Sequence, residues 1–148
     1  ARDYVIPQRR PFIWPAGELD TEAMRRVAEV FLGRRDFAAM QNVGTHLAHT
    51  VRTVHSVELV CGQWPEELQV RVAADGFLKQ MVRNMVGCLV RAGRHKLTPE
   101  EMRAILDAKD RRLAPATAPA QGLCLERVLY EQGAEKRSEF PVLGSGLW

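Results

Sequence analysis

The sequence predicts an α+β domain in which an antiparallel or mixed β-sheet carries helices on one face. Two neighbouring segments, 51–60 and 68–72, are rich in β-branched residues and are separated only by a short turn, which is typical of a hairpin. Helical patterns lie before and after this hairpin and do not alternate with strands, so the β-α-β order of a parallel fold is absent. The 148 residues, 46% of them hydrophobic, suffice for one domain with its own core.

The N-terminal part is expected to hold one strand, one loop and one helix. Residues 2–6 predict a short strand, and three prolines with a glycine predict a connecting loop over residues 7–18. Asp20 fits the N-cap of a helix. Apolar residues then recur at helical spacing until Gly33 supplies the end of that helix.

Residues 77–92 predict an amphipathic helix with Arg83 at the margin of its apolar side. An arginine in this position either extends its charged end to solvent or lies along the helix. In the second case it needs an anion, because an unpaired buried charge is strongly unfavourable. Its planar fork suits a carboxylate or a phosphate. Gly87, one turn further on, leaves room for another backbone to come close.

The C-terminal part is expected to hold one more helix and one more strand. Thr98 starts a capping box with proline at the first helical position, so a helix should follow it. Residues 113–122 are rich in alanine and proline and predict a loop. Residues 123–130 carry apolar residues on both faces and predict an interior strand. Residues 131–148 show no pattern and are expected to form a tail of uncertain order.

The composition permits a nucleic-acid partner and argues against several other classes. The net charge of +3 is mildly basic. No apolar run approaches the roughly 18 residues that a membrane-spanning helix needs. Three widely spaced cysteines form no CxxC motif, which favours a reducing compartment. His46 and His49 lie in a polar loop without the further ligands of a zinc site, so no metal site is expected.

Several segments, in order and with matching spacing, resemble motifs of the TruA-type tRNA pseudouridine synthases. GRRDFAAM at 33–40 resembles "G-x-h-D-F-x-x-F", with Met40 where phenylalanine is usual, and TVRTV at 50–54 resembles "s-x-R-t-i". GFLKQMVRNMVG at 76–87 resembles the "gFL…nMVRNivG" helix motif. The run from 96 to 130 resembles the closing "k-D-R…p-T-A-P-a-x-G-L-y-L-x-x-V-x-Y" motif.

The resemblance implies half of a pseudouridine synthase fold, with residues 1–130 as its C-terminal α/β domain. Enzymes of this family isomerise uridine to pseudouridine in tRNA, chiefly in the anticodon arm, and use neither a metal nor an organic cofactor. Arg83 matches the arginine that pairs with their catalytic aspartate. The G-R-T-D-A-G-V-H motif of that aspartate does not occur here and is expected to precede Ala1. The chain alone is therefore expected to be inactive.

The family also has a tyrosine, in an "R-x-Y-x-Y" motif, that stacks on the target base. Residues 1–4 fit "A-R-x-Y", which makes Tyr4 this tyrosine. Residues 4–7 also fit the second tyrosine of the motif, and Arg2 then takes the place of the first. Both alignments remain open. Seven further residues are candidates for RNA contact or for lining the pocket: Arg34, Arg35, Arg52, Phe77, Asn84, Gly122 and Leu123.

The implied partners are tRNA, the missing N-terminal half and a second copy of the enzyme, since bacterial members of the family are homodimers. No membrane is implied. The expected location is the cytoplasm, with an organelle or the nucleus left open. The alternative function is a non-catalytic RNA-binding or degenerate module of the same fold. A third possibility is a purely structural domain.

Overall fold

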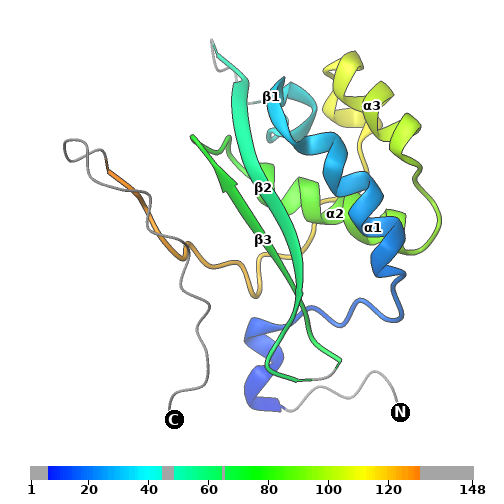
Figure 1. Ribbon diagram of the computed structural model, residues 1–148, viewed down its shortest axis with the longest axis vertical. Coiled ribbons are helices and arrows are strands. Elements are labelled where there is room, and N and C mark those ends of the chain that lie inside the picture. Colours follow the sequence, from blue (N-terminus) through cyan, green and yellow to red (C-terminus); the bar gives the residue numbers. More distant parts are fainter. Residues whose placement is uncertain (1–6, 45–48, 65, 131–148) are drawn as a thin grey trace.

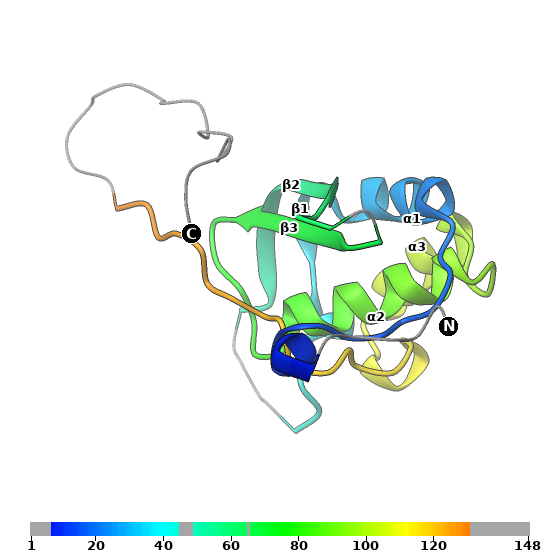
Figure 2. The same cartoon turned by 90° about the horizontal axis from the view of Figure 1, so that it is seen from below.

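The computed structural model describes residues 7–44, 49–64 and 66–130. Three strands form one antiparallel sheet in the order β1-β2-β3, and a layer of helices packs on one of its faces, with α2 beneath the strands in Figure 2. The predicted α+β class is confirmed. The strands are β1 (Gly33–Asp36), β2 (Val51–Cys61) and β3 (Leu68–Ala74), and the α-helices are α1 (Thr21–Ala28), α2 (Met81–Gly93) and α3 (Pro99–Ala108) (Figure 1).

Within the described residues, four short 3₁₀ helices accompany these elements. The segment predicted as a proline-rich loop holds the first of them, and another follows α3 directly, at the start of the alanine- and proline-rich loop. They are η1 (Pro7–Phe12), η2 (Glu29–Phe31), η3 (Ala38–Met40) and η4 (Arg111–Leu113). The strand expected over residues 2–6 and the tail expected over 131–148 lie outside the described residues.

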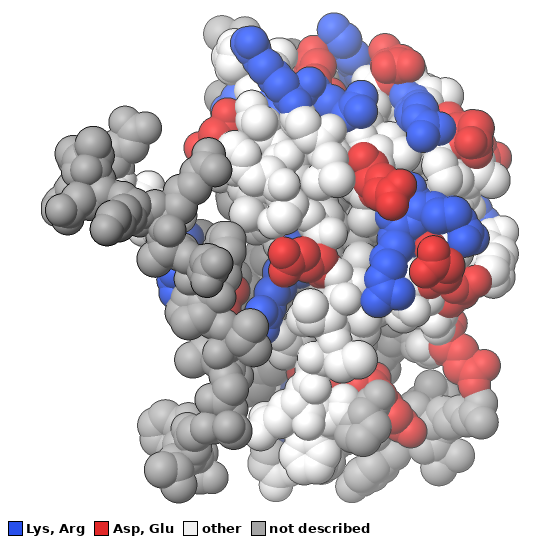
Figure 3. Space-filling view, in the orientation of Figure 1, with Lys and Arg blue, Asp and Glu red and all other residues white. Residues whose placement is uncertain are grey.

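The predicted hairpin is confirmed as β2 and β3, which pair from Cys61 opposite Leu68 to Val54 opposite Ala74. The register shifts between Val54 and Ser56, so β2 bends there, as a β-bulge does. One face of the hairpin packs on the core. On the opposite face, towards the viewer in Figure 3, most of the surface left of centre belongs to uncharged residues, and most of the acidic and basic side chains lie above it and to its right.

The core lies between the sheet and the three α-helices. Its largest fully buried side chains come from α1, η2, the 37–40 segment, α2 and α3, and they belong to one continuous cluster. Methionines are numerous in it, and their flexible side chains fill irregular gaps between helices and sheet. The largest buried side chains are Met24, Phe31, Phe37, Met40, Met81, Met85, Leu89 and Met102.

Both predicted helix starts at a capping residue are confirmed. The Asp20 carboxylate accepts hydrogen bonds from the backbone N–H groups of Glu22 and Ala23 at the start of α1. Thr98 and Glu101 form the reciprocal capping box of α3. Each pair satisfies N–H groups that have no acceptor inside the helix.

Helix α2 begins at Met81, four residues later than the start predicted at residue 77. Gln80, just before it, has a φ of 63°, a left-handed conformation that interrupts a right-handed helix. The backbone N–H of Asn42 also bonds the Lys79 carbonyl, which ties the connection between β3 and α2 to the loop after η3. The apolar pattern thus continues into a segment whose backbone is not helical.

The prediction of an interior strand over residues 123–130 is wrong for the described part of the chain. These residues pair with none of the three strands, and every one of them is exposed. Tyr130, for example, is 82% exposed. A strand needs the hydrogen-bonding edge of another strand, and an apolar pattern alone does not supply that edge.

Candidate active site

Helix α2 holds Arg83 half-buried in its first turns, against the loop that follows η4. The Arg83 Nε donates to the carbonyl of Ala118 at 2.9 Å, and the Ala118 N–H donates to the Arg83 carbonyl at 3.1 Å. Among residues 7–44, 49–64 and 66–130, no acceptor is recorded for either terminal nitrogen of Arg83. The guanidinium is therefore anchored at one edge, and the described residues leave its fork open to an anion.

The close backbone approach expected at Gly87 is confirmed. A side chain there would collide with the Ala116 carbonyl oxygen and would place its Cβ 3.4 Å from the Ala118 nitrogen. Glycine thus lets the loop lie directly on α2, one turn after Arg83.

Asn84, next to Arg83, is fully buried, with an exposed fraction of 0%. Its Nδ2 donates to the Met40 carbonyl at 2.7 Å. Its Oδ1 accepts from the Thr117 hydroxyl at 2.7 Å and from the Arg111 Nη2 at 3.0 Å. Both ends of the amide are engaged inside the protein, so in this structure Asn84 supports the fold around Arg83 and takes no part in the accessible surface.

Arg111 completes this arrangement, which we call the Asn84 network (Asn84, Arg111 and Thr117). Its Nη2 also donates to the Thr117 hydroxyl oxygen at 2.9 Å, and its Nη1 donates to the Ala114 carbonyl at 3.1 Å. The acceptors recorded for Arg111 are thus all neutral. Its charge contributes to lowering the pKa of Cys88, but burial dominates and raises that pKa to about 12. The Cys88 thiol is therefore a core group without nucleophilic reactivity.

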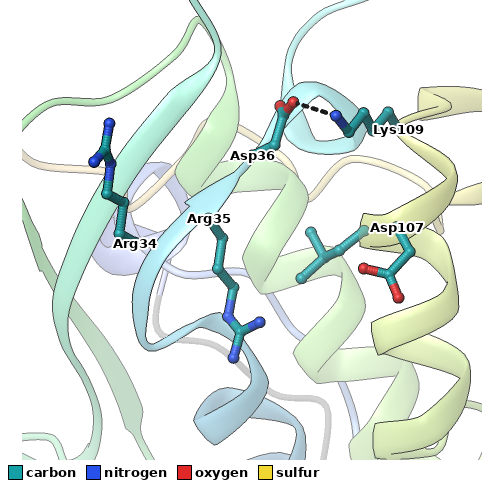
Figure 4. Close-up of a pocket in the computed structure, with 6 residues that line it drawn as sticks. Arg34, Arg35, Asp36, Asp107 and Lys109 are labelled. Carbon is teal, nitrogen blue, oxygen red and sulfur yellow. Dashed lines mark ion pairs between the residues drawn. The ribbon is translucent and has the colours of Figure 1, made fainter.

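Arg34 and Arg35 follow each other on β1 and point to opposite faces of the strand (Figure 4). They line a hollow between β1 and the end of α3, together with Asp36, Leu106, Asp107 and Lys109. The hollow therefore carries both signs of charge, and acidic side chains offset part of its attraction for an anion.

Asp36 in this hollow has ordered partners. The Lys109 Nζ lies 3.0 Å from its Oδ2, and the Thr50 hydroxyl donates to its Oδ1 at 2.6 Å. Partial burial alone would raise the pKa of Asp36, but the hydrogen bonds from Thr50, Lys109 and the Ala38 N–H outweigh it and lower that pKa.

Arg52 lies on β2 directly opposite Arg35 of β1. Its Nη1 donates to the carbonyls of His49 and Val51 at 3.1 and 2.8 Å. Gly76 lies against this side chain, since a Cβ there would be 3.4 Å from the Arg52 Nε. The structure therefore brings Arg52 next to the segment that carries Phe77, a residue that is 40% exposed.

Gly122 and Leu123 belong to a turn closed by the hydrogen bond from the Leu123 N–H to the Ala120 carbonyl. Gly122 has a φ of 82° and lies against the Phe12 carbonyl, so a side chain would be strained there and would also collide. Leu123 is 55% exposed. Tyr4, the candidate base-stacking residue, and His46 lie outside the described residues.

Two further observations, on metal binding and on membrane crossing, apply to the described ranges. No group of three histidine, cysteine or acidic side chains lies close enough there to hold a metal ion. No helix in those ranges is long and apolar enough to cross a membrane.

Sequence reasoning assigned no role to Arg111, Thr117 or Ala118, although the structure places them around Arg83 and Asn84. A signal was present in the matched "k-D-R…p-T-A-P" motif, in which an arginine and a threonine stand out in an alanine- and proline-rich run. Their contacts with α2 span 27 to 35 residues, so no local pattern reveals them.

Comparison with known proteins shows to which family the chain is similar. Residues 27–131, well over half of it, match the family model described as tRNA pseudouridine synthase. The chain is 51% identical over 127 residues to the tRNA pseudouridine synthase A of Maridesulfovibrio salexigens, covering 86% of this chain and 47% of that protein. It is 49% identical over 144 residues to the enzyme of the same name from Solidesulfovibrio magneticus, covering 95% and 52%.

The chain thus spans about half the length of the relatives that it matches. The matched range contains β1, the β2–β3 hairpin, α2 and the loop that holds Arg83. The chain belongs to the tRNA pseudouridine synthase family.

Proposed function

We propose that this chain is the C-terminal half of an enzyme that isomerises uridine to pseudouridine in tRNA, in the anticodon arm. Arg83 would pair with the catalytic aspartate, which lies in the half of the enzyme outside this chain. Family membership supports the reaction class. The observation that carries the role of Arg83 is its anchored Nε beside terminal nitrogens for which the described residues offer no acceptor.

The physical argument rests on what a half-buried guanidinium requires. Its fork matches a carboxylate in a bidentate pair, and such a pair keeps the carboxylate ionised and fixes its direction. A general base or nucleophile needs both properties. An arginine without this partner would keep a partly desolvated charge uncompensated, which is unfavourable.

The remaining candidate residues are of types suited to binding RNA. Arg34, Arg35 and Arg52 would contact phosphates, which positions the tRNA without reading its sequence. The target uridine must leave its stack to be reached. Phe77 and Leu123, both exposed apolar groups, would line the pocket that receives it, and Tyr4 would stack on the base. The complete enzyme would act as a homodimer in the cytoplasm, without a metal or organic cofactor.

The test uses the full-length enzyme and an unmodified tRNA transcript. Arg83→Ala should lower turnover at least about 100-fold, because removing one partner of a buried ion pair costs about 3–5 kcal/mol. Arg83→Lys should recover only part of this loss, since lysine lacks the planar fork. Arg103→Ala is the matched control, an exposed arginine on α3 paired with Glu100. Wild-type turnover by Arg83→Ala would refute the role of Arg83.

One observation favours the alternative of an RNA-binding module without catalysis. No aspartate within the described ranges has a recorded contact with Arg83, and Asp20, Asp36, Asp75 and Asp110 accept hydrogen bonds elsewhere. The two functions differ when the other half of the protein is supplied. Turnover restored by adding the N-terminal half supports the enzyme, and tRNA binding without turnover supports the module.

A further inference from the structure

The loop that anchors Arg83 has few side chains that could form hydrogen bonds within the loop. Residues 113–120 read LAPATAPA, in which Thr117 is the only residue with a hydrogen-bonding side chain. The position of the Ala118 carbonyl, which accepts from the Arg83 Nε, therefore depends on what fixes Thr117 and its neighbours.

Besides the bond from the Arg83 Nε, three contacts fix this loop to α2. The loop lies on Gly87 without an intervening side chain. The Ala118 N–H bonds the Arg83 carbonyl. The Thr117 hydroxyl donates to the buried Oδ1 of Asn84 while it accepts from Arg111. The directions of these two hydrogen bonds are fixed. The Arg111 nitrogen can only donate, so the Thr117 hydroxyl accepts from it and donates its own proton to Asn84.

The Asn84 network is anchored at both ends. Asn84 is held by the Met40 carbonyl at the end of η3, and Arg111 is held by the Ala114 carbonyl. The network therefore fixes the position of the loop relative to both the core and α2. The network is centred on the fully buried Asn84, and a hydrogen bond at a buried group is stronger than the same bond at the surface.

We propose that Asn84, Arg111 and Thr117 are positioning residues for Arg83. They hold the 114–118 segment so that the Ala118 carbonyl fixes the Nε edge of the guanidinium, and the terminal nitrogens then point in one direction. An arginine side chain is otherwise mobile about several bonds, and catalysis tolerates little misplacement of a catalytic group. The proposal rests on the role of Arg83 stated under Proposed function.

The experiment compares Thr117→Val, Thr117→Ser and Arg111→Lys in the full-length enzyme. Thr117→Val keeps the volume and removes the hydroxyl, Thr117→Ser keeps the hydroxyl, and Arg111→Lys keeps the charge without the fork. Thr117→Val and Arg111→Lys should each lower the single-turnover rate on a tRNA transcript about tenfold, the usual effect of losing one hydrogen bond to a charged group. Thr117→Ser should stay within about twofold of wild type, and tRNA affinity should stay within about twofold for all three.

A double-mutant cycle separates positioning from general stabilisation. If Thr117 acts through Arg83, adding Thr117→Val to Arg83→Lys should lower the remaining rate by less than about twofold. A full tenfold further loss in the double variant would overturn the proposal. So would wild-type rates for both Thr117→Val and Arg111→Lys.

The matched controls are two residues for which the described part of the chain shows no hydrogen bond to Arg83 or to the Asn84 network. Thr50→Val removes a hydroxyl that bonds the Asp36 carboxylate at 2.6 Å, and Arg103→Lys alters an exposed arginine. Both should keep the wild-type rate, and thermal unfolding of every variant shows which of them are folded. If Thr117→Val does not fold, Arg111→Lys carries the same cycle. A rate unaffected by Arg83→Ala would instead refute the role of Arg83, independently of these variants.

Discussion

Helix α2 and the 123–130 segment are both rich in apolar residues, but only α2 finds cover for them within the described part of the chain. The apolar side of α2 packs into the core, and its polar Asn84 has bonding partners at both ends. The 123–130 segment lies extended, with its apolar side chains in solvent.

The difference shows that the conformations of the two regions are determined in different ways. Around α2, contacts from η3, η4 and the 114–118 segment converge, so this part of the chain determines its own geometry. In the 123–130 segment the sequence provides an apolar pattern on both faces, and the described residues supply no strand edge for it. A large exposed apolar stretch of this kind is typical of an interaction surface.

Loss of the buried amide of Asn84 should have the largest effect on stability. Asn84→Ala leaves the Met40 carbonyl and the Thr117 hydroxyl without their partner and opens a cavity, so the free energy of unfolding should fall by about 3 kcal/mol. Urea denaturation measures the change. Asn42→Ala, an asparagine in the loop after η3 for which no side-chain hydrogen bond appears among the described contacts, is the control and should change it by less than about 0.5 kcal/mol. Equal effects of the two substitutions would contradict the structural importance of the network.

Gly87→Ala tests the contact between α2 and the loop. In a free helix this change stabilises by roughly 0.5–1 kcal/mol. Here the new Cβ would collide with the Ala116 carbonyl, so a destabilisation of about 2 kcal/mol is expected, in the range of overpacking. Gly76→Ala is the matched control, because a Cβ there meets only the Arg52 side chain at an ordinary distance. A stabilised Gly87→Ala variant would show that the loop does not lie on the helix.

Short-range patterns were sufficient to predict most of the elements. Asp20 and Thr98 each act on N–H groups within three residues, and the hairpin strands follow one another directly, so the sequence alone places them. The start of α2 was misplaced because Phe77 and Leu78 continue the apolar pattern while Gln80 turns the backbone left-handed. Apolar spacing does not report the sign of φ.

Contacts between residues that lie far apart in the sequence could not be predicted from such patterns. The resemblance singled out Arg83, and the physical argument required an anion for it only if it lay along the helix. Neither identified the Ala118 carbonyl that holds its Nε, 35 residues away. The same limit explains the 123–130 segment. Its composition predicts a strand, but whether a strand forms depends on an edge that a local pattern cannot supply.

The exposed segment gives a prediction that compares this chain with the full-length enzyme proposed above. In the isolated chain, Leu125→Ser should change the free energy of unfolding by less than about 0.5 kcal/mol, since the side chain is exposed. In the full-length protein the same substitution should cost about 1.5 kcal/mol or more, if the other half buries the segment. Denaturation of both forms gives the two values. Equal small values would show that the segment stays exposed in the complete protein.

The smallest expected effect concerns Asp36 and acid pH. Its pKa in the folded protein lies below its ordinary value of 3.8, because hydrogen bonds from Thr50 and Lys109 outweigh partial burial. Stability that comes from a lowered carboxylate pKa is fully present above the unfolded value and is lost as the pH falls through the folded one. The wild-type chain should therefore lose part of its stability below pH 3.8 that Asp36→Asn, which lacks this contribution at every pH, does not lose.

Unfolding free energies measured from about pH 2 to pH 6 on both proteins test this difference, since the two curves should converge at the acid end. Asp107→Asn is the control, because it removes a carboxylate from the same hollow that has no ion pair among the described residues. Its curve should run parallel to that of the wild type. If Asp36→Asn also ran parallel to the wild type, the ion pair with Lys109 would contribute nothing in solution. The stability of the hollow between β1 and α3 would then come from packing alone, whereas the region around α2 depends on its hydrogen bonds.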